Sequence, residues 1–314
     1  GLLRLGFSGG GLLGLGGGAL LRLLLGQHLR RVVGLLALHK PRAIENAGDA
    51  PQFIRSPYEP VLSPPDDITF DAAAAAGLEI KKAPTGHLLV HPLVNGKDVG
   101  WFIFDTGAGA NILEKRAAET LGVEQYGEIP AVGVGGTTMS HVCRPETLTV
   151  GPATMLKPQM IVMDLAFLDA HMSVPIAGLV GYGILHRTVA KVDMETPLVE
   201  LFDPAKFDGA GLKWSKLAVD GRVACVEASF EDHTGYFHLD TGAGASTVTM
   251  HTPAVERLKL LEGRDTTPTV NGGVGGLVSA KLGDLAWFEI GGHRMERVAA
   301  VFAIQAKGAF ANPY

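Results

Sequence analysis

The six-residue sequence Asp-Thr-Gly-Ala-Gly-Ala occurs twice in this chain, each time directly after an apolar run. The first copy, in WFIFDTGAGA, begins at Asp105, and the second, in YFHLDTGAGA, begins at Asp240. The two aspartates are separated by 135 residues (240 − 105), about the length of a small domain. The repeat therefore predicts two copies of one structural unit, each presenting a carboxylate.

The first copy has short β-type runs separated by Gly, Pro and Asn residues. Asn95-Gly96 is a strong hairpin signal, and the pattern after Asp105 becomes helical over ANILEKRAAETLGV, with Gly122 as a stop. A glycine-rich VGVGGTT follows, and two strands, about Thr188–Val192 and Leu198–Phe202, close this copy.

The second copy repeats this order. The segment KLAVDGRVACVEASF reads as a hairpin with Asp220-Gly221 at its turn, and it precedes the second aspartate. A helical PAVERLKLLEG, a glycine-rich NGGVGG and the strand-like AWFEIGG come after it. We therefore expect a mostly β protein of two related lobes, with a short helix in each lobe and a cleft between them.

Composition limits the class of protein. A chain of 314 residues can bury the cores of about two domains, and 46% hydrophobic with 19% charged residues is a globular composition. The net charge of −5 and the absence of a basic stripe argue against a nucleic-acid partner. The two cysteines, Cys143 and Cys225, are expected to be buried thiols, with a disulfide between them as the alternative.

We expect four segments along the chain. Residues 1–40 are rich in Leu and Gly and predict either an export signal or membrane anchor, or a disordered extension. The first alternative would make the protein periplasmic, secreted or membrane-anchored. Residues 41–77 are Pro-rich and predict a linker. Residues 78–205 and 206–314 correspond to the N-terminal and C-terminal lobes.

Two aspartates in equivalent turns suggest a specific chemistry. An Asp at the end of a strand, on a tight Gly turn, projects its carboxylate from the sheet, and two such turns can meet across a pseudo-two-fold axis. Two carboxylates a few ångströms apart cannot both ionise cheaply, so they share a proton. One then acts as general base on a water while the other protonates a substrate carbonyl, and because the titration belongs to the pair, neither aspartate is given a fixed role.

These residues resemble the active-site turns of aspartic peptidases, and the Ala after Asp-Thr-Gly is similar to the retropepsin-like branch of that family. The resemblance implies hydrolysis of polypeptides by an activated water, without metal, cofactor or covalent intermediate. It also implies that the threonines brace the turns, that the glycines allow close approach, and that the VGVGG hairpin is a flap over the substrate. The implied site comprises catalytic Asp105 and Asp240; supporting Thr106, Gly107, Ala108, Thr241, Gly242 and Ala243; flap candidates Val134, Gly135, Gly136, Val274 and Gly275; and the hydrophobic-hydrophobic-Gly element Leu179, Val180 and Gly181, which passes beneath the turn.

The second copy departs from this pattern. The glycine of the hydrophobic-hydrophobic-Gly element, Gly181, lies 76 residues (181 − 105) after the first aspartate, and the same offset from Asp240 falls beyond Tyr314. We therefore expect the C-terminal lobe to be truncated, with no such element under Asp240, and the natural protein to continue past Tyr314. Both half-sites lie in one chain, which predicts a monomer.

Several other readings of the motif remain open. A duplicated fold of this kind could be a catalytically silent peptide-binding protein. Asp-x-Gly turns in two lobes also occur in actin-like and sugar-kinase-like folds, but there more strand should follow the turn. A dinucleotide-binding reading of FDTGAGANI lacks the third glycine.

The histidines give no metal signal. They are scattered, with no HExxH and no Cys/His ligand spacing, and His87 and His91 have no third ligand nearby in the sequence. We therefore expect no metal and no cofactor, and no membrane contact except through residues 1–40.

Overall fold

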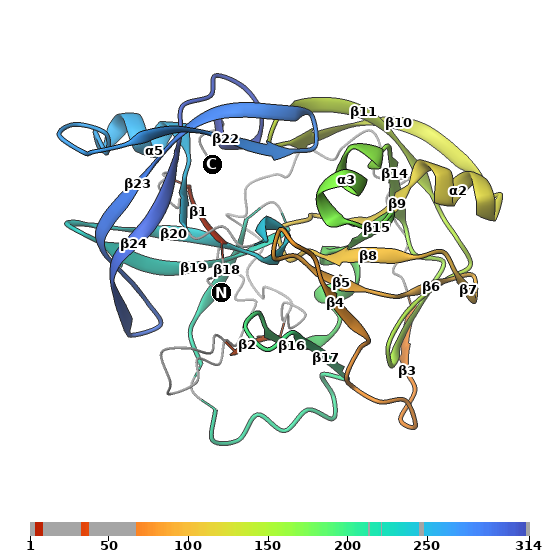
Figure 1. Cartoon of the computed structure of the whole chain (residues 1–314). Coiled ribbons are helices and arrows are strands. Elements are labelled where there is room, and N and C mark those ends of the chain that lie inside the picture. The colour runs from red at the N-terminus through yellow and green to blue at the C-terminus, as the bar shows by residue number, and fades with distance from the viewer. Residues whose placement is uncertain are drawn as a thin grey trace, which may run out of the picture.

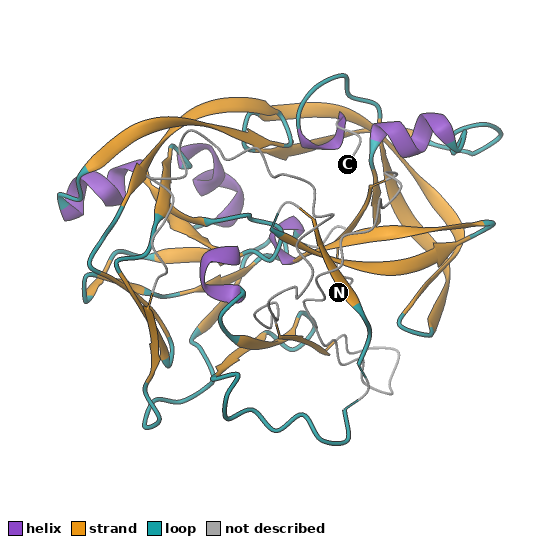
Figure 2. Ribbon diagram, turned by 180° about the vertical axis from the view of Figure 1, so that it is seen from behind, coloured by secondary structure: helices purple, strands orange, loops and turns teal. Residues whose placement is uncertain are grey.

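The structure, a computed structural model, describes residues 4–8, 33–37, 67–212, 214–220, 222–244 and 248–311. These residues form two lobes, each built around a mixed β-sheet (Figure 1). Helices are short and lie mostly around the strands (Figure 2). The mostly β, bilobal fold that the repeat and the resemblance to aspartic peptidases predict is confirmed.

The N-terminal lobe has two sheets with a shared apolar core. Buried side chains of both sheets, such as Phe102 and Leu148, belong to one hydrophobic cluster. The larger sheet has the order β10 (Gln125–Gly133), β11 (Gly136–Cys143), β14 (Met160–Met163), β9 (Asn111–Glu114), β15 (Ile176–Val180), β8 (Trp101–Phe104), β5 (Leu88–Val90) and β4 (Ile80–Lys82). The smaller sheet has the order β3 (Asp67–Phe70), β13 (Ala153–Leu156), β12 (Thr147–Val150), β6 (Leu93–Val94) and β7 (Lys97–Asp98).

The C-terminal lobe has one eight-stranded sheet that curls on itself. Pairing of β19 with β23 closes six of its strands into a ring. Phe230, Phe237 and Phe288, on three of these strands, are fully buried and pack edge to face. The strand order is β18 (Leu217–Asp220), β19 (Val223–Phe230), β20 (His233–Asp240), β1 (Arg4–Ser8), β21 (Val248–Met250), β24 (His293–Ala303), β23 (Gly276–Ile290) and β22 (Thr267–Gly273).

A small third sheet and short helices complete the fold. The third sheet consists of β17 (Leu198–Phe202), β16 (Val189–Asp193) and β2 (Val33–Ala37). The helices are α2 (Lys115–Leu121), α3 (Asp169–Met172), α4 (Tyr182–Leu185) and α5 (Thr252–Arg257), with 3₁₀ turns η1 (Ala166–Leu168), η2 (Thr241–Ala243) and η3 (Ala309–Ala311). Among the described residues no helix is long and apolar enough to span a membrane.

The duplication is visible in the order of the elements. In each lobe a strand leads into the Asp turn (β8 and β20), a second strand follows (β9 and β21), and a short helix comes next (α2 and α5). A glycine-tipped hairpin follows the helix, and β9 and β21 each pair in parallel with a later strand, β14 and β24 respectively. The two lobes therefore present their Asp turns from equivalent places.

Several turns and hairpins lie where the local sequence predicts them. Asn95 and Gly96 form the two-residue turn between β6 and β7, and both adopt positive φ (54° and 70°), as a primed hairpin turn requires. The strand pair β16–β17 and the hairpin β18–β19 also lie where the sequence indicates. Gly122 ends α2 with φ 64°.

The helical expectation for ANILEKRAAETLGV is wrong in its first half. Residues Asn111–Glu114 form β9, which pairs with β14 on one side and β15 on the other, so that sheet hydrogen bonds override the helical spacing. The helix begins only after Glu114, whose side chain accepts hydrogen bonds from the backbone N–H groups of Arg116 and Ala117. Strand therefore does follow the turn, so this feature of the sequence does not exclude an actin-like fold.

The place beneath the second Asp turn is occupied. In the N-terminal lobe β15 lies between β8 and β9, and in the C-terminal lobe β1 lies between the equivalent strands β20 and β21. β15 runs parallel to β8, whereas β1 runs antiparallel to β20. The expectation of no strand under Asp240 is therefore wrong, because backbone groups of β20 and β21 find a partner elsewhere in the chain.

Parts of the expected N-terminal segments take regular structure. Residues 4–8 and 33–37, inside the expected 1–40 segment, are strands β1 and β2, and residues 67–70, inside the expected 41–77 linker, form β3, which pairs with β13. The predictions for the rest of 1–66 lie outside the described residues.

Candidate active site

Each aspartate of the repeat is held at the end of a strand. Asp105 follows β8, and its backbone N–H donates to the Val180 carbonyl oxygen at 2.9 Å. Its Oδ1 accepts a hydrogen bond of 2.8 Å from the backbone N–H of Gly107, so the turn closes on its own carboxylate. Asp240 is the last residue of β20 and leads into the 3₁₀ turn η2.

The two turns face each other across the lobe boundary. A methyl group at Gly107 would lie 2.5 Å from Cγ of Asp240, and a methyl group at Gly242 would overlap the carboxylate of Asp105. Any larger residue at either glycine would therefore displace the opposite carboxylate. The structure brings the two predicted aspartates together as one pair.

A symmetric set of hydrogen bonds joins the turns. Thr106 Oγ1 donates to the Leu239 carbonyl oxygen at 2.7 Å and accepts from the Thr241 backbone N–H at 3.0 Å. Thr241 Oγ1 donates to the Phe104 carbonyl oxygen at 2.7 Å and accepts from the Thr106 N–H at 3.1 Å. Both threonines are buried, so these four bonds are shielded from water and hold the lobes in register.

The element Leu179-Val180-Gly181 lies beneath the first turn. A methyl group at Gly181 would overlap the carbonyl oxygen of Ala110, and the next residue, Tyr182, donates its N–H to the Ala108 carbonyl oxygen at 2.9 Å. Asn111, a fully buried residue that sequence reasoning missed, accepts the Gly181 N–H with Oδ1 at 3.0 Å. In the sequence, Asn111 stands out only as a residue with an amide side chain within an apolar run.

Burial and charge act together on the carboxylate pair. The pKa of Asp105 is raised well above its ordinary value of 3.8, first because burial disfavours the charged form and second because the carboxylate of Asp240 is close. Oδ1 of Asp240 is buried and makes no hydrogen bond with any residue that the structure describes. The pair can therefore hold one proton at a pH at which an ordinary aspartate has lost it.

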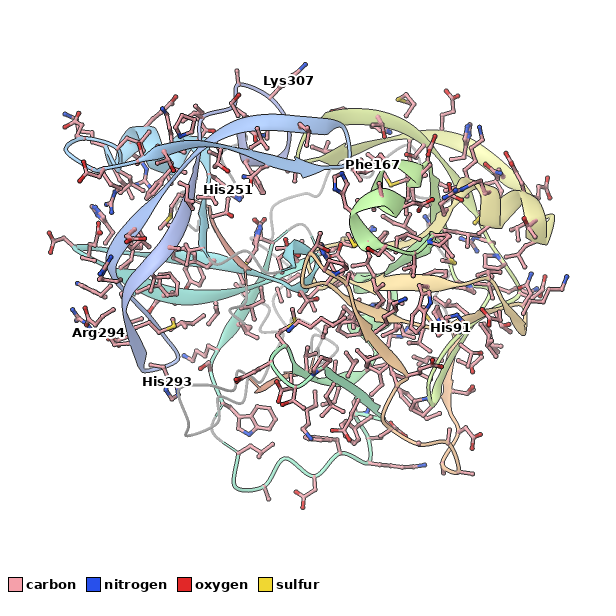
Figure 3. The ribbon with its side chains drawn as sticks, viewed as in Figure 1. His91, Phe167, His251, His293, Arg294 and Lys307 are labelled. Atoms are coloured by element: carbon pink, nitrogen blue, oxygen red, sulfur yellow. The ribbon has the colours of Figure 1, made fainter. Side chains whose placement is uncertain are left out.

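A histidine of the N-terminal lobe reaches the turn of the C-terminal lobe. His87 Nε2 lies 2.7 Å from the Gly242 carbonyl oxygen, and Nδ1 lies 2.8 Å from Thr85 Oγ1. Because a carbonyl only accepts, Nε2 carries the proton. His91 instead lies near Asp98 and against Trp101 on the N-terminal lobe (Figure 3), so the two histidines serve separate contacts.

The two glycine-rich hairpins touch at their tips. We refer to β10–β11 as the N-terminal flap and to β22–β23 up to Leu282 as the C-terminal flap; Figure 1 shows them meeting above the lobes. The Gly135 N–H donates to the Val274 carbonyl oxygen at 2.8 Å, and a methyl group at Gly135 would overlap the backbone of Gly275. The flap candidates Val134, Gly135, Gly136, Val274 and Gly275 therefore lie together.

The segment after β24 holds the N-terminal flap. Gln305 Nε2 donates to the carbonyl oxygens of Val134 at 2.9 Å and Lys307 at 2.6 Å. The side chain of Lys307 itself points outward from the molecule (Figure 3). Gln305 is a second residue that sequence reasoning missed, because a contact over 171 positions leaves no local signal.

Neither cysteine belongs to the carboxylate pair. Cys143 and Cys225 are both free and buried, as expected, and the disulfide alternative is wrong. Burial raises the pKa of each thiol to about 12.

A comparison with known protein families agrees with this geometry. The family model described as aspartyl protease matches residues 90–184 and 226–309, more than half of the chain, and each matched region contains one of the two Asp turns. The chain therefore belongs to the aspartyl protease family. No curated protein matches it.

Proposed function

We propose that this member of the aspartyl protease family is an endopeptidase that cleaves polypeptides with a water molecule activated between Asp105 and Asp240. The observation that carries the proposal is the meeting of the two carboxylates, each of which lies against the glycine of the opposite turn. A carboxylate and a carboxylic acid side by side supply a base and an acid at one point.

The chemistry follows from one shared proton. The ionised carboxylate removes a proton from the water as its oxygen attacks the peptide carbonyl carbon, and the protonated carboxyl gives its proton to the carbonyl oxygen. The tetrahedral intermediate then collapses: its C–N bond breaks, the nitrogen takes the proton of the pair, and one hydroxyl of the intermediate gives its proton back, so that the pair again holds one shared proton. The raised pKa of Asp105 supports this cycle at mildly acidic pH, because one carboxyl stays protonated there.

The flaps suggest the form of the substrate. Two hairpins that touch over the pair would cover an extended polypeptide from both sides, and their backbone groups could bond to its main chain. A flap on each lobe, together with Ala108 and Ala243 after the glycines, favours a retropepsin-like site built within a single chain. Because both halves come from one chain, we propose that the active form is a monomer.

Replacing the two alanines tests the electrostatics. Serine at Ala108 and Ala243 could donate hydrogen bonds to the charged carboxylates and so lower the pKa of the pair. The pH–rate profile of the double variant A108S/A243S should therefore shift to more acidic pH. An unchanged profile would contradict this role for the alanines.

The second candidate is a peptide-binding protein without catalysis on the same fold. A transition-state analogue of the statine type separates the two, because an enzyme binds such an analogue far more tightly than the matching substrate peptide. A binding protein would hold both about equally.

The main experiment is hydrolysis of casein between pH 3 and 7, with Asp105→Asn and Asp240→Asn beside the wild type. We expect each substitution to abolish cleavage. Asp193→Asn is the matched control, because Asp193 is a buried aspartate that only caps a turn, with Oδ1 accepting from the backbone N–H groups of Glu195 and Thr196. Cleavage that survives in either variant would refute the proposed pair, and a folded wild type without cleavage would favour the peptide-binding protein.

A further inference from the structure

Three neighbouring strands of the C-terminal lobe, β18, β19 and β20, bring together three side chains that can bind a metal ion. Asp220 ends β18, Cys225 lies in β19 and His238 lies in β20. Asp220 is paired with Val223, two residues before Cys225, and Cys225 is directly opposite His238. Because side chains alternate along a strand and cross-strand partners share a face, the pairing puts all three on one face.

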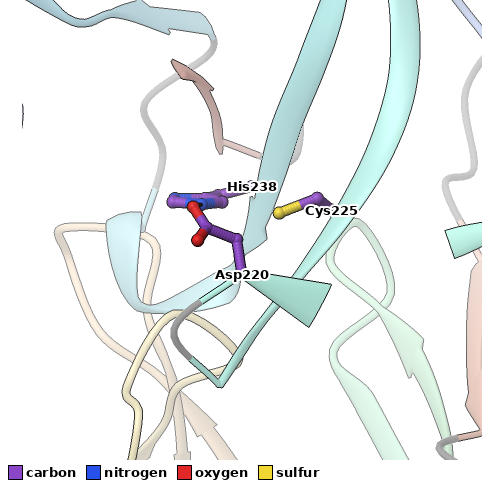
Figure 4. A group of neighbouring side chains, drawn as sticks. All are labelled: Asp220, Cys225 and His238. Carbon is purple, nitrogen blue, oxygen red and sulfur yellow. Dashed lines mark hydrogen bonds and ion pairs between the residues drawn. The ribbon is translucent and has the colours of Figure 1, made fainter. Parts of the chain in front are cut away.

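The distances fit a small coordination sphere. His238 Nε2 lies 3.1 Å from Asp220 Oδ2, and the three potential ligand atoms lie within 4.8 Å of one another. Figure 4 shows the sulfur of Cys225 pointing toward the carboxylate and the imidazole ring. With Zn–S near 2.3 Å and Zn–N near 2.0 Å, tetrahedral ligands are about 3.2–3.7 Å apart, so the side chains need to move by less than about 1 Å.

Burial leaves one side of the cluster accessible. Cys225 is 1% exposed, whereas the side chains of His238 and Asp220 are 16% and 38% exposed. A metal ion can therefore enter beside Asp220 and keep a water as its fourth ligand. This cluster lies two residues along β20 from Asp240, yet it shares no residue with the carboxylate pair.

The fold itself does not require these residues. In the first repeat, Ile103 lies 135 residues before His238 and is paired with Leu89, as His238 is paired with Cys225, and Ala83, bonded to His87, takes the place of Asp220. The other lobe therefore builds the same part of the fold without thiol, imidazole or carboxylate. Among the described residues this is the one group of three such ligands, and it belongs to one lobe alone.

We propose that Asp220, Cys225 and His238 form a zinc-binding site with an open fourth position. Thiolate, imidazole and carboxylate together suit Zn²⁺ better than the hard cations that take oxygen ligands alone. On binding, a Zn–S bond forms, the S–H bond that now points at the Val223 carbonyl oxygen breaks, and the proton passes to solvent. The site goes beyond the proposed peptidase reaction, whose water is activated by the carboxylate pair.

The test is direct metal binding by the whole chain, without any activity assay. We expect one Zn²⁺ per chain in competition with a chromophoric chelator, and Co²⁺ should give a tetrahedral visible spectrum with a thiolate charge-transfer band. In Cys225→Val and in Asp220→Thr, each of which removes one ligand, affinity should fall by at least roughly 10–100-fold. Cys143→Ser, which removes the other buried thiol, should leave binding unchanged.

Asp220→Thr is the variant that should keep the fold, because Asp220 lies at a partly exposed hairpin end. Circular dichroism on each variant confirms the fold. Absence of zinc binding by the wild type, a Co²⁺ spectrum without the thiolate band, or unchanged affinity in either ligand variant would overturn the site.

Discussion

Replacing Thr106 by Val should destabilise the protein strongly through the lobe boundary. Valine keeps the shape of the side chain but removes the hydroxyl that donates to Leu239 and accepts from Thr241. The substitution leaves a buried N–H and a buried carbonyl oxygen each without a hydrogen bond, at about 1–3 kcal/mol apiece. The carbonyl oxygen has a second lone pair that can accept another hydrogen bond, so its share of the loss should be at the low end. We therefore expect the unfolding free energy to fall by about 2–4 kcal/mol in total.

Urea unfolding measures this loss as the change in midpoint multiplied by the slope. The matched control is Thr188→Val, because Thr188 is fully buried but its hydroxyl makes only long contacts of 3.4 and 3.5 Å to carbonyl oxygens of its own turn. The cost of the double variant T106V/T241V should differ from the sum of the single variants by about 0.5 kcal/mol or more, because the two threonines belong to one hydrogen-bond network. A cost for Thr106→Val no larger than for Thr188→Val would refute the reasoning.

Three further predictions concern the pair and its surroundings. The pKa of Asp105 is raised in the folded state, so above about pH 3.8 the folded protein holds a proton that the unfolded chain has lost. The unfolding free energy of the wild type, measured with urea, should therefore fall relative to that of Asp105→Asn as the pH rises from about 4. Gly135→Ala should raise KM for a peptide with little change in unfolding free energy, because the added methyl group meets Gly275 in the opposite flap. His87→Ala should lower kcat by roughly tenfold, equivalent to about 1.4 kcal/mol, because the bond that orients the Gly242 carbonyl is lost.

Each of these has its own control. A stability difference between wild type and Asp105→Asn that is constant from pH 4 to 7 would contradict the raised pKa. Gly77→Ala, at a glycine with open space around it, should leave KM unchanged, and an equal effect of both alanines would exclude the flap contact. His91→Ala should leave kcat unchanged, and equal losses in both histidine variants would remove the special role of His87.

Much of the fold could be predicted from the sequence because its signals are local and occur twice. The turn at Asn95-Gly96 needs positive φ at two neighbouring residues, and Gly122 ends a helix for the same reason. The Asp turns were recognisable because the same six residues recur at domain spacing. The strand β9 was missed because its apolar residues also fit a helix, and only the neighbouring strands decide between the two.

The rest of the site depends on contacts between distant residues. His87 acts on Gly242 across the lobe boundary, and Gln305 holds the N-terminal flap across most of the chain. The cluster of Asp220, Cys225 and His238 has no recognisable ligand spacing, because strand pairing rather than sequence separation brings its members together. Such contacts become visible only when the register of the strands is known.

The four threonine hydrogen bonds also have a kinetic consequence. They join Thr106 and Thr241, which belong to one polypeptide, so the two halves meet in a first-order step whose rate does not depend on protein concentration. A tether of this length keeps the halves at an effective concentration far above that of a dilute solution. The carboxylate pair should therefore stay assembled at any dilution at which the chain remains folded.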